Sequence, residues 1–202
     1  MAVKAALAIL MFASPLALHL AIVTESRTVM VAFLAVLAVG ALAARMPAWM
    51  AALAAVAAIA SAWIDLRVIA QLALAGPALA FLAGAWLFGR TLLPGRTPLV
   101  EIIARLERDG DFPAGLAGYT RGLTWAWAIL LAGIPAVSAA LAFFATAAAQ
   151  SLFVNFASYT LLALLYFGEY AYRVWRYPQF PHKNPVTVAA NLVRRAPKLL
   201  RP

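Results

Sequence analysis

Long apolar stretches separated by short polar breaks set the pattern of this chain. Six stretches come close to the roughly 20 residues that an α-helix needs to cross the hydrocarbon core of a membrane. They cover residues 4–23, 28–44, 47–64, 68–88, 122–147 and 151–172. The pattern predicts an all-α fold, a polytopic membrane bundle of about six transmembrane helices. The second stretch is short and the third is rich in Ala, so a five-helix alternative merges or demotes one of them.

The breaks between the first four stretches are typical of tight helical hairpins. Residues 24–27 form a compact polar break, and Pro47 favours a new helix start because it lacks the N–H of a helix interior. Residues 65–67 bring an aspartate and an arginine to a point where a turn would leave the membrane. Residues 1–88 are therefore predicted to be a four-helix transmembrane hairpin region.

Three further regions complete the predicted organisation. They are a cytoplasmic loop at 89–121, a two-helix transmembrane region at 122–172 and a basic cytoplasmic tail at 173–202. Within the loop, Thr97 is placed to cap a helix that starts at Pro98, and apolar residues then recur at helical spacing. These apolar residues are Leu99, Ile102, Ile103 and Leu106. We expect an amphipathic helix that lies on the membrane or packs beneath the bundle, with docking of a partner as the alternative.

Composition supports a membrane protein and removes several classes of enzyme. Hydrophobic residues make up 66% of the chain and charged residues only 11%, and the mean hydropathy is +0.91, which excludes an ordinary water-soluble domain. The chain has no cysteine, so disulfides, thiolate nucleophiles and cysteine metal sites are excluded from it. The sequence shows no phosphate-binding loop, serine elbow or pair of catalytic carboxylates. Enzymatic activity is therefore not expected, and neither is a bound cofactor.

The charged residues predict which way the helices run. With both termini in the cytoplasm, all 16 Lys and Arg residues except Arg27 and Arg67 fall on the inner side. Glu25 and Asp65 balance these two arginines, so the outer side is neutral and the whole net charge of +9 lies on the inner side. In a membrane protein such an excess sets orientation and attracts anionic lipid headgroups, and it does not indicate nucleic-acid binding.

Polar side chains form a stripe along the last predicted helix. Its members are Ser151, Asn155, Tyr159, Leu162, Tyr166, Glu169 and Arg173. They recur at three- and four-residue spacing, which places them on one helical face. Polar groups within a membrane span mark binding paths or hold helices together. The alternative to a binding site is a structural role, in which an ion pair holds the helices together and the aromatic residues lie at the membrane surface.

The entrance of the fifth predicted helix offers partners for this stripe. Tyr119, Arg121 and Thr124 lie there, and Arg121 is placed to bind Glu169 or a phosphate group. The candidate polar and binding cluster consists of Arg121, Thr124, Asn155, Tyr159, Tyr166, Glu169 and Arg173. No metal site is expected, because His19 has no second histidine or carboxylate at ligand spacing and the other histidine, His182, lies in the tail.

Several segments of the second half resemble a family of small bacterial inner-membrane proteins. The matching segments are Pro94-Gly95-Arg96-Thr97-Pro98-Leu99, Tyr119-Thr120-Arg121, Thr124-Trp125-Ala126-Trp127, Ser151-Leu152-Phe153, Asn155-Phe156, Glu169-Tyr170 with Arg173, and Arg176-Tyr177-Pro178. They lie within residues 87–180. Members are typically encoded beside acyl carrier proteins, acyltransferases and ketosynthases of aryl-polyene or xanthomonadin-type lipid pathways, and some carry the name ketosynthase. That label does not suit this chain, because such a condensing enzyme needs a cysteine nucleophile.

Three hypotheses follow for the function. The resemblance implies an accessory protein of the bacterial inner membrane that supports acyl-lipid or polyene assembly, with an acyl carrier protein or a lipid-assembly enzyme as partner. A small transporter of a lipid or amphiphile is the alternative. An intramembrane acyl or lipid transferase is the least supported, because no acid–base pair with suitable spacing is visible.

Overall fold

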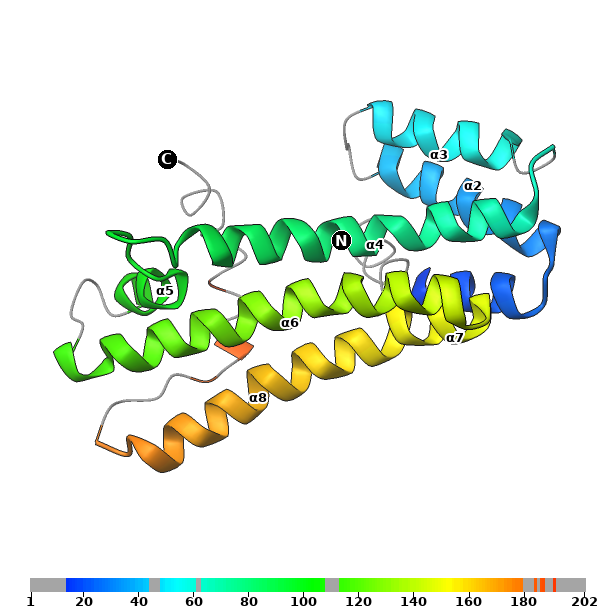
Figure 1. The fold of residues 1–202 in the computed structure, drawn as a ribbon. Coiled ribbons are helices and arrows are strands. Elements are labelled where there is room, and N and C mark those ends of the chain that lie inside the picture. The colour runs from blue at the N-terminus through cyan, green and yellow to red at the C-terminus, as the bar shows by residue number, and fades with distance from the viewer. Residues whose placement is uncertain are drawn as a thin grey trace. The chain divides into compact units, whose positions relative to one another are not determined.

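The computed structural model describes residues 14–43, 48–60, 63–107 and 113–179, together with 184, 186, 187 and 191. Every regular element in these residues is helical (Figure 1). The first half contains a helix at Ser14–Val23, then α2 (Arg27–Ala43), α3 (Ala48–Ala60) and α4 (Leu66–Arg90). The second half contains α5 (Leu99–Glu107), the 3-10 turn η1 (Ala114–Leu116), α6 (Ala117–Phe144), α7 (Ala147–Leu152), the π-helical turn η2 (Phe153–Ala157) and α8 (Ser158–Arg176). The predicted all-α fold is therefore confirmed.

Among the described residues, three helices are long and apolar enough to cross a membrane. They are α4 with 25 residues, α6 with 28, and the continuous helix of α7, η2 and α8, which covers 30 residues from Ala147 to Arg176. Ser14–Val23 and Arg27–Gly40 are shorter apolar helices. Helix α3 has 13 described residues, and residues 47, 61 and 62 of the stretch predicted at 47–64 lie outside the described part of the chain.

Polar caps explain where the helices begin. Ser26 Oγ accepts from the Val29 backbone N–H at 3.4 Å, and Asp65 Oδ1 accepts from the Arg67 N–H at 2.7 Å. Thr146 Oγ1 accepts from the Ala149 backbone N–H at 3.2 Å. These bonds satisfy first-turn N–H groups that have no partner within the helix. The breaks predicted at 24–27 and 65–67 are present, whereas 44–47, which contains the predicted break at Pro47, lies outside the described residues.

Some predicted boundaries need correction. The fifth predicted span begins at Ala117 rather than at residue 122, and it ends at Phe144 rather than at 147. The sixth begins at Ala147 rather than at 151, because the Thr146 cap starts the helix there. Residues 4–13 of the first predicted span lie outside the described part of the chain, as does nearly all of the tail beyond residue 179.

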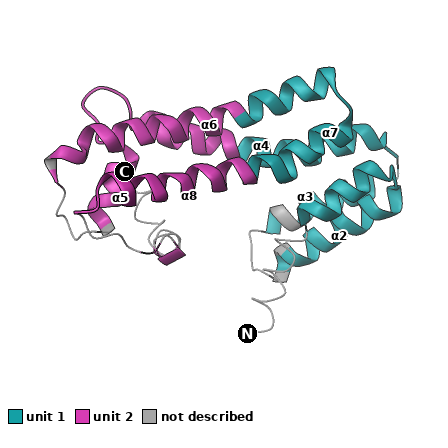
Figure 2. Ribbon diagram, turned by 90° about the horizontal axis from the view of Figure 1, so that it is seen from below, with its two compact units in different colours: residues 1–80, 134–159 teal, residues 81–133, 160–202 magenta. Residues whose placement is uncertain are grey.

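The chain forms two compact units, each assembled from distant segments (Figure 2). Unit 1 contains residues 1–80 and 134–159, and unit 2 contains residues 81–133 and 160–202. The four predicted regions follow the order of the chain, whereas these units each combine an early segment with a late one. Helices α4 and α6 contribute one part to each unit.

Unit 1 is organised around an apolar core. The core residues come from the first helix (Leu18, Ala21, Ile22), α2 (Met30, Phe33, Leu34), α4 (Ile69, Ala70, Leu74) and η2 (Val154). The core residues of α2 follow three- and four-residue spacing, which places them on one face of the helix. Other positions of these helices carry exposed apolar residues, such as Val39 of α2 and Leu72 of α4. Helix α3 lies along α2 (Figure 1).

Unit 2 packs the second part of α4 against the first part of α6. A Cβ atom added at Gly84 would lie 3.2 Å from Leu131 Cδ1, so the glycine allows close approach of these helices. One turn further along α4, the rings of Phe88 and Trp127 stack with centroids 5.9 Å apart. These contacts hold the last part of α4 against the first part of α6, and α5 lies between these two helices in the chain.

The unit 1 core predicts a sharp contrast between two leucines of α4. Leu74 is 1% exposed and Leu72 is 66% exposed, so Leu74→Ala leaves a cavity and Leu72→Ala does not. We expect Leu74→Ala to cost about 2 kcal/mol, the low end for such changes, because unfolded membrane helices stay in an apolar medium. Thermal unfolding in detergent measures the effect. Equal midpoints for the two variants would contradict this packing.

Candidate functional site

The predicted polar cluster is divided between the two units. Asn155 and Tyr159 belong to unit 1. The other five residues, Arg121, Thr124, Tyr166, Glu169 and Arg173, belong to unit 2. The single predicted stripe therefore contributes to two separate sets of contacts.

Glu169 is the centre of one set. Its Oε1 accepts a hydrogen bond from the Tyr119 hydroxyl at 2.9 Å and lies 3.3 Å from Arg173 Nε. The predicted pairing of Glu169 with Arg173 is thus present. It is an ion pair rather than a directed hydrogen bond, because buried Arg173 Nε has no hydrogen-bond partner. The Tyr119 ring packs against Tyr172 with centroids 5.9 Å apart and against Tyr177 with centroids 5.4 Å apart, so the residue that donates to Glu169 is itself held by aromatic neighbours.

Arg121 has a different role from the predicted one. Its Nη2 donates to the backbone carbonyl of Leu92 at 2.8 Å. Leu92 lies just after the end of α4, where carbonyl groups lack partners within the helix, so the guanidinium satisfies a terminal carbonyl. The expected contact between Arg121 and Glu169 is replaced by this bond, while Glu169 is held by Tyr119 and Arg173.

Thr124 fixes the start of α5. Its side chain is completely buried, donates to the Thr120 carbonyl at 2.7 Å and accepts from the Val100 N–H at 3.3 Å. Thr91 accepts from the neighbouring Leu99 N–H at 3.0 Å. The first N–H groups of α5 are therefore satisfied by threonines of other elements, instead of by the predicted cap Thr97.

The amphipathic helix is present as α5 and begins at Leu99. Glu101 is 8% exposed and its Oε1 accepts from Arg105 Nη2 at 2.7 Å and Nε at 3.0 Å. Arg105 keeps its side chain 47% exposed, so the ion pair is neutral, with its carboxylate buried and its guanidinium partly exposed. Because Thr91 and Thr124 hold its first turn, α5 is a fixed part of unit 2.

Asn155 belongs to a buried polar cluster that also includes His19 and Ser151. Asn155 Nδ2 donates to Ser151 Oγ at 3.0 Å, and Ser151 Oγ lies 3.1 Å from His19 Nδ1. Ser151 is completely buried, and the His19 ring meets the Phe156 ring edge-on at 5.4 Å. Asn155 and Phe156 lie in the π-helical turn η2, and such turns are frequent at functional sites.

A second chain of polar groups, in which Ser138 and Gln150 are buried and Gln71 is half-buried, joins three helices of unit 1. Gln71 Nε2 donates to Gln150 Oε1 at 2.8 Å, and Gln150 Nε2 donates to Ser138 Oγ at 3.3 Å. Sequence reasoning missed these contacts because the partners lie 12 to 132 positions apart in the chain, so no helical spacing connects them. The available signal was the cost of an isolated polar residue within a membrane helix, which predicts a partner without saying which one.

The two remaining members of the predicted cluster are Tyr159 and Tyr166. Tyr159 is 47% exposed, and Tyr166 packs its ring edge-on against neighbouring Phe167 at 5.3 Å. In the described part of the chain, no three His, Asp or Glu side chains gather as a metal site would require. The geometry is that of helices joined by polar pairs.

Comparison with known proteins adds no further constraint. No protein-family model, curated protein or solved structure matches the chain.

Thr124 offers a direct test of how α5 is held. Thr124→Val keeps the shape of the side chain but leaves the Val100 N–H without its partner, which we expect to cost about 1–3 kcal/mol. Faster hydrogen exchange at residues 99–107 would report the release of α5. Thr124→Ser retains the hydroxyl and is the matched control. Unchanged exchange in the valine variant would show that other contacts hold the helix.

Proposed function

We propose that this protein is a non-enzymatic accessory protein of a bacterial inner membrane that supports acyl-lipid or polyene assembly by holding a soluble partner at its cytoplasmic end. The proposed orientation is that of the sequence analysis, with about six spans and both termini inside. The partner is an acidic acyl carrier protein or a lipid-assembly enzyme of the pathway that the resemblance implies.

The observation that carries this proposal is the anchoring of basic residues to fixed elements of unit 2. Arg96 follows α4 and donates from Nη1 to the Arg90 carbonyl at 3.3 Å, while the Arg90 guanidinium lies 4.7 Å from the centre of the Trp86 ring. Arg105 projects from α5, which the two threonines hold in place. Arg176 ends α8 with its guanidinium 5.4 Å from the centre of the Tyr177 ring.

A fixed arrangement of cations suits an acidic protein better than a loose basic loop would. Less side-chain and backbone freedom is lost on binding when the charged groups are already in position. Complementary charge also speeds the encounter and favours acidic partners over basic ones. The same residues would attract anionic lipid headgroups on the inner surface of the membrane.

Charge reversal at two exposed arginines tests the proposal. Arg96→Glu combined with Arg176→Glu should weaken binding of the purified acyl carrier protein roughly tenfold at low salt, because two attractions become repulsions. The difference should shrink at high salt. Surface plasmon resonance with the detergent-solubilised protein measures both effects.

Arg67→Glu is the matched control, since it changes the same type of residue in unit 1 and should leave this binding unchanged. Recovery of no carrier protein or pathway enzyme at low salt in mild detergent would contradict the proposal. So would equal affinity of the protein and the doubly reversed variant.

A second function, transport of a lipid or amphiphile, draws support from the buried polar cluster of unit 1. Asn155, Ser151 and His19 meet beside the π-helical turn, where the regular helix is interrupted. In a transporter, such groups would contact the polar part of the cargo during its passage.

Export from cells distinguishes this second function from the first. Asn155→Leu should reduce export of the pathway product severalfold if the cluster lines a path, whereas exposed Tyr159→Phe should not. Lipid analysis of the cell interior and exterior, at matched protein levels, measures the effect. Normal export by Asn155→Leu would rule out this role for the cluster.

A further inference from the structure

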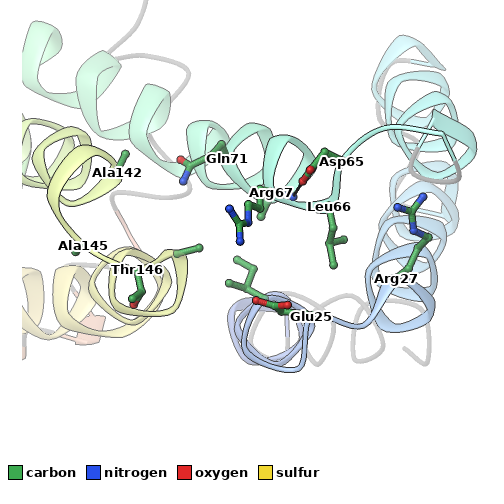
Figure 3. Close-up of a pocket in the computed structure, with 12 residues that line it drawn as sticks. Glu25, Arg27, Asp65, Leu66, Arg67, Gln71, Ala142, Ala145 and Thr146 are labelled. Carbon is green, nitrogen blue, oxygen red and sulfur yellow. Dashed lines mark hydrogen bonds between the residues drawn. The ribbon is translucent and has the colours of Figure 1, made fainter.

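Unit 1 contains a cleft of about 800 Å³ at the connections between its helices (Figure 3). It lies where the first helix leads into α2, where α4 begins, and where α6 leads into α7. Its polar lining consists of Glu25, Arg27, Asp65, Arg67, Gln71 and Thr146. Ile22, Leu66 and several alanines form the apolar part of the lining. The volume lies within the roughly 300–1,000 Å³ of small-molecule sites.

The charged residues of the cleft form a distinctive set. Glu25, Arg27, Asp65 and Arg67 are the four charged residues that the proposed orientation leaves on the outer side of the membrane. The fold brings two sequence-distant breaks together, so that all four charges line one space. The cleft contains two cations and two anions and is neutral as a whole.

Three of the six polar residues are already used to hold the walls. Asp65 caps α4, Thr146 caps α7, and Gln71 donates to Gln150. Glu25 and Arg67 extend toward the cleft from different walls (Figure 3). Neither of these two side chains takes part in an ion pair with another described residue. The cleft thus presents a separated carboxylate and guanidinium beside an apolar surface.

The backbone at Glu25 is unusual. Its φ of 48° lies in the left-handed region, where a helix commonly ends on Gly or Asn, and it is the only residue other than glycine with positive φ in the described chain. A glutamate there is less stable than a glycine would be. Such strain often occurs at functional positions, and here it holds a carboxylate at the cleft.

We propose that this cleft binds the zwitterionic phosphodiester headgroup of a membrane amphiphile, such as a phosphatidylethanolamine. The phosphate would bind Arg67, with Arg27 adding positive potential, and the ammonium group would bind Glu25. The glycerol and first methylene groups would lie along Ile22 and Leu66. A simple anion would meet two carboxylates in this cleft, and a simple cation would meet two guanidinium groups, so a molecule with both charges fits best.

This proposal involves unit 1 only and does not depend on carrier-protein docking in unit 2. Lipid retention without carrier-protein binding, or carrier-protein binding without lipid retention, would therefore identify which of the two proposals has failed.

Native mass spectrometry of the full-length protein in detergent tests the assignment, with an equimolar mixture of phosphatidylethanolamine and phosphatidylglycerol as the probe. We expect the protein to retain phosphatidylethanolamine preferentially. Arg67→Gln should reduce retention of both lipids at least tenfold, because each has a phosphate. Glu25→Gln should instead shift the preference toward phosphatidylglycerol, because it removes the ammonium partner and one repulsive charge.

Matched variants separate binding from folding. Leu72→Ala, a change at an exposed residue of unit 1 that does not line the cleft, should leave the lipid ratio unchanged. Glu25→Gly should raise the thermal unfolding midpoint, because it relieves the left-handed backbone, while it loses the preference for phosphatidylethanolamine. These opposite directions cannot both result from damage to the fold.

Two results would overturn the proposal. One is an unchanged lipid ratio in folded Glu25→Gln and Arg67→Gln. The other is equally strong retention of soluble glycerophosphoethanolamine, which has the same headgroup without acyl chains and would assign the cleft to a soluble phosphodiester. Weak retention of that compound beside strong retention of the lipid supports a membrane amphiphile.

Discussion

Polar groups in a chain this apolar must be paired within the protein, and this constraint organises both units. Lipid supplies no hydrogen bonds, so an isolated hydroxyl, amide or charge within a membrane helix is costly. In unit 1 the buried polar groups meet in two sets, one around Ser151 and one around Gln150. In unit 2 Thr124 satisfies the start of α5, and Glu169 is held by Tyr119 and Arg173. Hydrogen bonds are directional, so these contacts fix the positions of the helices along one another more closely than apolar packing alone would.

The two proposed sites differ in charge. The cleft of unit 1 is neutral, and its Glu25 carboxylate and Arg67 guanidinium come from different walls, which suits a zwitterion. The basic residues of unit 2 are anchored by an aromatic ring, a carbonyl or a held helix, which suits an acidic protein surface. An accessory protein of lipid assembly could use both, because it would then contact a membrane amphiphile and a soluble acyl carrier.

The sequence predicts the elements well and their partners poorly. Hydropathy and breaks identify α4, α6 and the last long helix, the start at Pro98 with helical spacing finds α5, and spacing finds the pair Glu169 and Arg173. These features are local, so periodicity reveals them. Arg121 binds a helix-end carbonyl, and His19 meets Ser151 across 132 positions of the chain, so neither contact has a local signature. For the cleft, the sequence shows only that two acidic and two basic residues are predicted to lie on the outer side. These residues come from separate breaks, so the sequence does not show that they line one space.

The central claim is the proposed topology, in which the positive-inside rule puts residues 24–27 and 65–67 outside and residues 89–121 inside, and site-directed labelling tests it most directly. The chain has no cysteine, so single cysteines can be introduced at Ala145, beside the cleft, and at Arg96 without further changes. A membrane-impermeant maleimide should label Ala145→Cys in intact cells and Arg96→Cys only after permeabilisation. Labelling of both in intact cells, or the reverse pattern, would contradict the account.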